Sequence, residues 1–165
     1  KYGKTGAAVA EVDLIRGIGR LVGLRVVDVP GATGYIDTNY LGIGELAFQA
    51  LEELDFVFVH VEAADEAGHE QDVEKKIFAI EQMDELVLGT ILHRMKHYDD
   101  FRLLLLPDHP TPISTGSHAP DPVPFLLFDS REDRGNTVPF DERALEDAKT
   151  FVDEGTRLLE LLFRK

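Results

Sequence analysis

Carboxylate and imidazole side chains gather in two short segments of this chain, residues 65–69 and residues 107–109, and a third histidine follows the second segment. Carboxylates and imidazoles together make the mixed oxygen and nitrogen ligand set that suits zinc, manganese and related divalent ions. A pair of such ions is a common means of promoting displacement at phosphorus. The residue types therefore predict a two-metal site, and its candidate ligands are Asp65, His69, Asp108, His109 and His118.

Each segment also has an ordinary structural interpretation. Several acidic residues surround Asp65 and His69, as they would in a solvated loop or near a helix N-terminus, where the dipole favours negative charge. The two residues would share one face of a helix, but Gly68 and the preceding strand favour a compact loop. An Asp-His pair between prolines is a common loop, and a lone histidine such as His118 is more often a surface residue than a ligand. The prediction therefore depends on the three signals occurring together.

Both segments directly follow apolar runs that predict buried strands, residues 56–61 and 103–106. Further strands are expected at residues 6–11, 24–29 and 123–128. The helices expected between and after the strands span residues 13–22 with Asp13 as the cap, about 43–53, about 72–91, 142–147 and 151–162. Strands that alternate with helices predict an α/β fold with a mostly parallel sheet flanked by helices. Ligands bind such sheets at the carboxyl ends of the strands, where both segments fall.

Length and composition limit the class of protein. The 165 residues can form one domain with a core, and 44% of them are hydrophobic, an ordinary share for a globular fold. No apolar run approaches the length of a membrane span and no signal peptide is recognisable, so we expect no membrane partner. The absence of cysteine excludes disulfides and thiolate metal sites and fits a cytoplasmic protein.

The net charge of −14, from 17 basic and 31 acidic residues, argues against nucleic acid and anionic membranes as partners. A phosphorylated substrate would also be repelled, unless bound metal ions or basic residues from elsewhere reverse the local sign. The remaining histidines have simpler explanations. His60 ends its strand and is expected to be packed, and His93 and His97 suit the C-terminal end of a helix.

Five stretches match the motifs of a known family, and they span nearly the whole chain: residues 12–19 (VDLIRGIG), 30–40 (PGATGYIDTNY), 58–69 (FVHVEAADEAGH), 106–112 (LPDHPTP) and 118–125 (HAPDPVPF). Through them the chain resembles the C-terminal part of the archaeal-type, cofactor-independent phosphoglycerate mutases of the alkaline phosphatase superfamily. The resemblance implies an alkaline-phosphatase-like core, present in part. Residues 1–165 would be the C-terminal portion of the metal-binding phosphotransfer domain.

The resemblance also assigns roles to the candidate ligands. Asp65, His69 and His118 correspond to the ligands of one divalent ion, and Asp108 and His109 to ligands of the second. In the family the second ion also takes an Asp and the nucleophilic Ser from an N-terminal segment, and a lid domain supplies phosphate-binding arginines. Neither that segment nor the lid is matched here, and the first residue is lysine rather than methionine, so we expect the interior of a longer chain.

The activity implied by the resemblance is the interconversion of 3-phosphoglycerate and 2-phosphoglycerate in glycolysis and gluconeogenesis, through a phosphoserine intermediate. It would use two divalent ions (Mn, Zn, Mg or Co) and no 2,3-bisphosphoglycerate. We expect the 165 residues alone to have no mutase activity. They are expected to form a homodimer through any sheet surface that is exposed, and Lys1 or Lys4 is expected near the substrate phosphate. The alternatives are another phosphotransfer substrate, as in proposed homoserine kinases or phosphonopyruvate-related enzymes, and a non-catalytic metal-binding or interaction domain.

Overall fold

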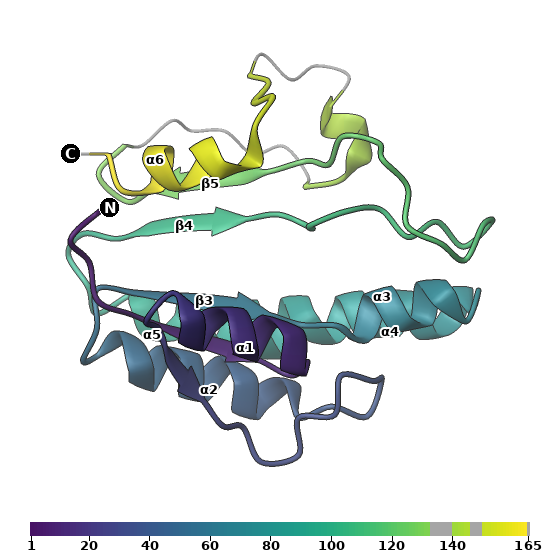
Figure 1. Ribbon diagram of the computed structural model, residues 1–165, viewed down its shortest axis with the longest axis horizontal. Helices are drawn as coiled ribbons and strands as arrows, with labels where there is room; N and C mark the ends of the chain where they lie inside the picture. Colours follow the sequence, from purple (N-terminus) through teal and green to yellow (C-terminus); the bar gives the residue numbers. More distant parts are fainter. Residues whose placement is uncertain (133–139, 146–149, 165) are drawn as a thin grey trace. The chain divides into compact units, whose positions relative to one another are not determined.

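The computed structural model describes residues 1–132, 140–145 and 150–164, and the chain divides into two compact units. One unit comprises Lys1–Lys96 together with Thr111–Ser117, and the other comprises His97–Pro110 together with His118–Lys165. Figure 1 traces the chain through both units and labels the α-helices and three of the strands.

A three-stranded parallel sheet in the order β2-β1-β3 is the base of the first unit. Its strands are β1 (Gly6–Ala10), β2 (Arg25–Val27) and β3 (Phe56–His60), and Ala8 pairs with Val26 on one side and Phe58 on the other. Every residue of β1 is buried, as expected for the central strand of a parallel sheet that is covered on both faces. The predicted α/β class, with a parallel sheet flanked by helices, is confirmed.

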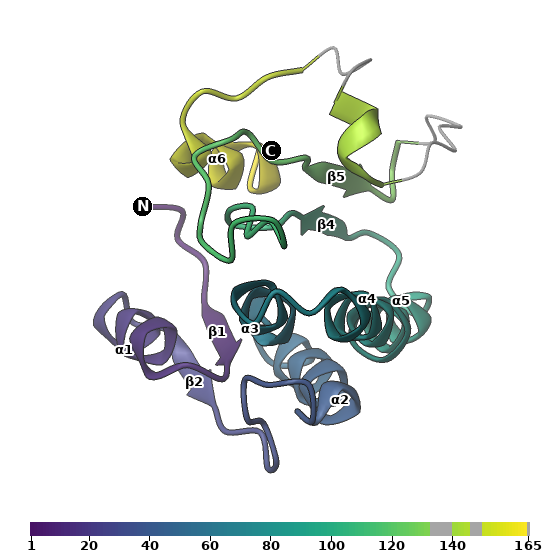
Figure 2. The same ribbon diagram turned by 90° about the vertical axis from the view of Figure 1, so that its right-hand side faces the viewer.

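Helices cover both faces of this sheet (Figure 2). Helix α1 (Asp13–Leu21) lies against the face that carries Ala8, and α2 (Tyr40–Leu51) packs on the opposite face, in a core that includes Val9. Asp13 was expected to cap α1, but the N-cap is Val12, without a side-chain hydrogen bond. Asp13 lies in the first turn instead, where its charge favours the helix dipole.

Helix α3 (Ala63–His69) occupies the segment for which a compact loop was predicted, so that prediction was wrong. Alanines favour the helix. Glycine suits position 68 in the last turn of α3 because any side chain there would collide with Thr111. The predicted long helix starts as expected, with Asp72 accepting a hydrogen bond from the Lys75 backbone at 3.0 Å. It runs through α4 (Val73–Gln82), the π-helical turn η1 (Met83–Leu88) and α5 (Gly89–Met95).

The second unit contains β4 (Arg102–Leu105) and β5 (Leu126–Asp129), which pair in an antiparallel manner. A parallel pair needs a crossover element, usually a helix, and the connection from 106 to 125 contains none. An ion pair joins the two strands, because Arg102 Nε of β4 lies 2.6 Å from Asp129 Oδ2 of β5. The Arg102 guanidinium also donates a hydrogen bond to the Leu162 carbonyl near the C-terminus.

Short helices complete the second unit. The 3-10 turn η2 (Glu142–Leu145) begins the helix predicted for 142–147, whose last two residues lie outside the described part of the chain. The predicted C-terminal helix starts later than expected, with the 3-10 turn η3 (Gly155–Arg157) leading into α6 (Leu158–Leu162). Among the described residues, no helix combines the length and apolar character needed to cross a membrane.

Candidate metal centre

Asp65 and His69 lie one turn apart on α3, which starts shortly after β3 ends at the carboxyl edge of the parallel sheet. Asp65 Oδ2 and His69 Nε2 are 3.1 Å apart, and both side chains reach solvent in part. The spacing of four residues on a helix therefore brings this predicted ligand pair together. These two atoms are close enough together that both could hold one divalent ion, with the carboxylate supplying charge and the imidazole a nitrogen donor.

The orientation of the His69 ring is set by a backbone carbonyl. His69 Nδ1 lies 2.9 Å from the Gly116 oxygen, and because a carbonyl can only accept, Nδ1 must carry the hydrogen. In the neutral ring, Nε2 then presents a lone pair to Asp65. This hydrogen bond raises the pKa of His69, and the negative charges of Asp65 and Glu66 raise it further. Two electron-rich atoms facing each other need a proton or a cation between them, and metal-bound histidines are commonly held in this way.

The loop of residues 111–117 is fastened directly to α3. Thr111 Oγ1 donates to Asp65 Oδ1, and the Thr111 oxygen accepts from Lys76 Nζ at 2.6 Å. The Gln71 side-chain amide donates to the Ile113 oxygen at 2.9 Å. The loop thus supplies contacts to both members of the Asp65–His69 pair. These contacts were not predicted, and the only signal was that Thr111 lies in one of the motifs carrying the family resemblance.

A carboxylate at the end of β1 supports the same edge of the sheet. Glu11 Oε2 accepts from the Glu62 backbone N–H at 2.9 Å, and Glu11 Oε1 accepts from the Thr38 hydroxyl. Glu11 therefore ties the loop before α2 to the residue that precedes α3. Sequence reasoning did not single out Glu11, since an isolated acidic residue after a strand has no distinctive pattern.

In the second unit, Asp108 and His109 follow β4, as predicted. The His109 backbone N–H donates to Asp108 Oδ1 at 3.0 Å, and His109 Nε2 lies 3.5 Å from Asp108 Oδ2. The rings of His109 and His118 lie 3.7 Å apart between centroids, tilted by 32°. A backbone hydrogen bond of 2.9 Å from Ala119 to Pro110 holds the two histidine-bearing segments together. The second unit thus presents two imidazoles side by side.

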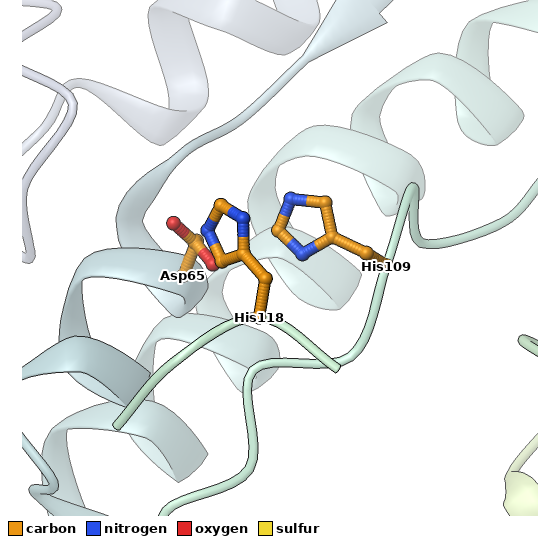
Figure 3. Close-up of side chains that lie close together, drawn as sticks. All are labelled: Asp65, His109 and His118. Atoms are coloured by element: carbon orange, nitrogen blue, oxygen red, sulfur yellow. The ribbon is translucent and has the colours of Figure 1, made fainter. Parts of the chain in front are cut away.

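Figure 3 draws Asp65 of the first unit and the histidines His109 and His118 of the second, a carboxylate and two imidazoles of the kind that bind divalent metals. The resemblance assigns His118 to the same ion as Asp65 and His69. The division of the ligands between two ions remains a prediction, and the carboxylate and imidazole donors of each unit suit a divalent metal.

The other basic candidates have structural partners. Lys4 Nζ lies 3.2 Å from Asp55 Oδ1, before the amino end of β1 and therefore at the sheet edge opposite to α3. Asp55 also accepts from the Thr5 backbone at 2.7 Å; this bond, the Thr5 hydroxyl and Lys4 lower the pKa of Asp55 to about 2. His60 is mostly buried and lies 3.6 Å from Glu62, in keeping with the expected packed histidine.

Known proteins similar to this chain include several named as phosphoglycerate mutases. The chain is 46% identical over 98% of its length to a probable 2,3-bisphosphoglycerate-independent phosphoglycerate mutase of Geobacter sulfurreducens, covering 41% of that protein. It is also 46% identical, over 98% of its length and 40% of the relative, to 2,3-bisphosphoglycerate-independent phosphoglycerate mutase 2 of Methanothermobacter thermautotrophicus. The chain therefore spans about two fifths of the length of these curated relatives.

A solved structure of the PH0037 protein from Pyrococcus horikoshii shares the fold, with a TM-score of 0.67 and 33% sequence identity. The superposition covers 76% of this chain and 32% of the solved chain. The model of the metalloenzyme superfamily matches residues 1–162, nearly the whole sequence. This match agrees with the donor atoms found after β3 and β4, and the chain belongs to the metalloenzyme superfamily.

Proposed function

We propose that this chain supplies metal ligands to a 2,3-bisphosphoglycerate-independent phosphoglycerate mutase, which interconverts 3-phosphoglycerate and 2-phosphoglycerate through a phosphoserine. The observation that carries the proposal is the Asp65–His69 pair, in which the Gly116 carbonyl holds His69 with Nε2 facing the carboxylate. The names of the similar proteins support the substrate, and the superfamily supports the use of metal.

The proposed ligands are Asp65, His69 and His118 for one divalent ion, and Asp108 and His109 for a second. When bound, such ions neutralise charge on a transferring phosphoryl group and make a hydroxyl a better nucleophile near neutral pH. The chain's own residues orient the donors. Gly116 holds His69 in the tautomer whose Nε2 can bind a cation, and the Asp65 carboxylate adds the negative charge that attracts one.

The nucleophilic serine is proposed to come from outside these 165 residues. Ser130 has a structural role, because its Oγ accepts from the Phe101 backbone N–H at 2.8 Å beside the β4–β5 pair. Ser114 and Ser117 lie in the loop that is fastened to α3. Ser130 follows β5 directly, but its hydroxyl is engaged by the Phe101 backbone, and neither Ser114 nor Ser117 follows a strand, where a serine nucleophile is commonly exposed on a sharp turn.

Mutase activity of the whole protein tests the proposal. After removal of metal with a chelator, 3-phosphoglycerate should remain unchanged in a 31P NMR assay, and added Mn²⁺ should restore the 2-phosphoglycerate signal. His69→Ala should abolish the restored activity, whereas His93→Ala, at an exposed histidine on α5, should not change it. Full activity of the chelated protein or of His69→Ala would contradict the metal-ligand assignment.

Two further outcomes would redirect the proposal. Turnover of homoserine and ATP without mutase activity would favour a different phosphotransfer substrate for the same site. Turnover of 3-phosphoglycerate by residues 1–165 alone would show that the nucleophile lies within them.

A further inference from the structure

We infer that Thr111 is a positioning residue for the metal ligand Asp65: its hydroxyl occupies one carboxylate oxygen so that only the other is offered to the ion. This inference rests on the proposed metal site and adds a residue to it. It predicts that Asp65 binds through Oδ2 alone and that the threonine hydroxyl, rather than the threonine bulk, determines the affinity.

The contact on which this depends is a side-chain hydrogen bond between residues far apart in sequence. Thr111 Oγ1 donates to Asp65 Oδ1, while Asp65 Oδ2 faces His69 Nε2 at 3.1 Å. Thr111 is only 4% exposed, so little water competes for its hydroxyl. The two carboxylate oxygens therefore have separate partners, and rotation of the carboxylate would break both contacts.

Thr111 is itself held in place from several directions. Lys76 Nζ donates to its carbonyl oxygen at 2.6 Å, and the flanking Pro110 and Pro112 restrict the backbone. A Cβ built on Gly68 would lie 2.8 Å from the Thr111 oxygen and 3.0 Å from Thr111 Cγ2, so α3 and Thr111 are in close contact. The branched side chain also has few allowed rotamers, which keeps the hydroxyl directed at the carboxylate.

A neutral hydroxyl suits this task better than a charged donor would. It satisfies Oδ1 without cancelling the carboxylate charge that attracts a cation, and residues that orient metal ligands commonly act in this way. Loss of such an outer hydrogen bond typically lowers metal affinity by about 10–100-fold. Without the hydroxyl, Asp65 could rotate, offer both oxygens and lose its alignment with His69.

The test compares three variants of the protein for Mn²⁺ affinity by calorimetry, after metal removal. Thr111→Val keeps the branched shape without the hydroxyl and should weaken binding by about 10–100-fold. Thr111→Ser keeps the hydroxyl and should bind nearly as the unsubstituted protein does. Thr115→Val is the matched control in the same loop, because the Thr115 hydroxyl donates to the loop carbonyls of Pro112 at 3.2 Å and Ser117 at 3.3 Å; it should leave affinity unchanged.

A second readout separates positioning from stability. The absorption spectrum at saturating Co²⁺ reports the ligand geometry of the bound ion, so it should change in Thr111→Val and stay unchanged in Thr111→Ser. If circular dichroism shows that Thr111→Val does not fold, Thr111→Ala replaces it with the same expected results. Equal affinity and an unchanged spectrum in the folded hydroxyl-free variant would overturn the inference while leaving the proposed metal site intact. Failure of the unsubstituted protein to bind Mn²⁺ would instead contradict the proposed site and the inference with it.

Discussion

Replacing Gly68 with alanine tests the close contact between α3 and the loop of residues 111–117. The new Cβ would lie 2.8 Å from the Thr111 oxygen, 2.9 Å from Lys76 Nζ and 3.0 Å from Thr111 Cγ2. The lysine end can move aside, but the Thr111 carbonyl belongs to the loop backbone. The substitution should therefore push Thr111 away from α3 and loosen its hydrogen bond to Asp65.

Two opposing effects determine the free energy of unfolding. Alanine favours a helix over glycine by about 1 kcal/mol, which would stabilise α3. Overpacking at a tight contact costs about 1–3 kcal/mol, and the carbonyl contact at 2.8 Å is shorter than real Cβ contacts allow. We expect the clash to dominate and Gly68→Ala to destabilise the protein by about 1 kcal/mol.

The matched control is Gly17→Ala in α1, where a new Cβ meets no atom of the described residues within 4 Å apart from its chain neighbours and the backbone of its own helix. Only the helix propensity changes there, so this variant should be more stable by about 1 kcal/mol. Urea unfolding followed by circular dichroism measures both variants. If Gly68→Ala is stabilised as much as Gly17→Ala, the loop does not pack against α3 as described and the reasoning is refuted.

Three further predictions concern stability away from the metal ligands. Asn39→Ala removes the N-cap of α2, whose side chain accepts from the Gly42 backbone at 2.9 Å, and should cost about 1 kcal/mol in urea unfolding; an unchanged midpoint would argue against the cap. Hydrogen bonds from Thr5 and Lys4 lower the pKa of Asp55 from 3.8 to about 2. The contribution of Asp55 to stability should therefore be present above pH 3.8 and be lost as the pH falls towards 2. In acid-unfolding curves, Asp55→Asn should remove this pH dependence. Burial, followed by the charges of Glu11 and Asp37, raises the pKa of Tyr40 from 10.0 to about 12, so stability should decline as the pH rises from 10.0 to 12. Ultraviolet titration of tyrosinate, with Tyr40→Phe as the reference, should show this late ionisation, and a Tyr40 titrating at its ordinary pKa would contradict it.

The strand and helix order could be read from sequence because hydrophobic periodicity is a local property. The run containing Val57 and Val59 predicted β3, and the alternation with helices predicted a parallel sheet. The antiparallel pairing of β4 and β5 was not predicted. A short apolar run such as Leu103–Leu105 has the same composition in either orientation, and only the connection decides the direction of its partner.

The candidate site was predictable as a set of residue types but not as a set of contacts. Asp65 and His69 were expected to converge, and they do, but on a helix rather than in a loop. A loop was predicted because glycine, here Gly68, usually weakens helices. In the structure the missing side chain of Gly68 instead leaves room for Thr111 against the helix. The hydrogen bond from Thr111 to Asp65 joins residues 46 positions apart, a separation that no local pattern reports.

The attachment of the loop of residues 111–117 to α3 has a consequence for the order of events during folding. The Thr111–Asp65 contact closes a loop of 46 residues, and such closure costs chain entropy before any contact compensates for it. Helix α3 can form from its own neighbours within nanoseconds to microseconds, but distant pairings of this kind are slow. The oriented ligand pair should therefore be one of the last features to appear, so that ion capture follows folding of the chain and does not direct it.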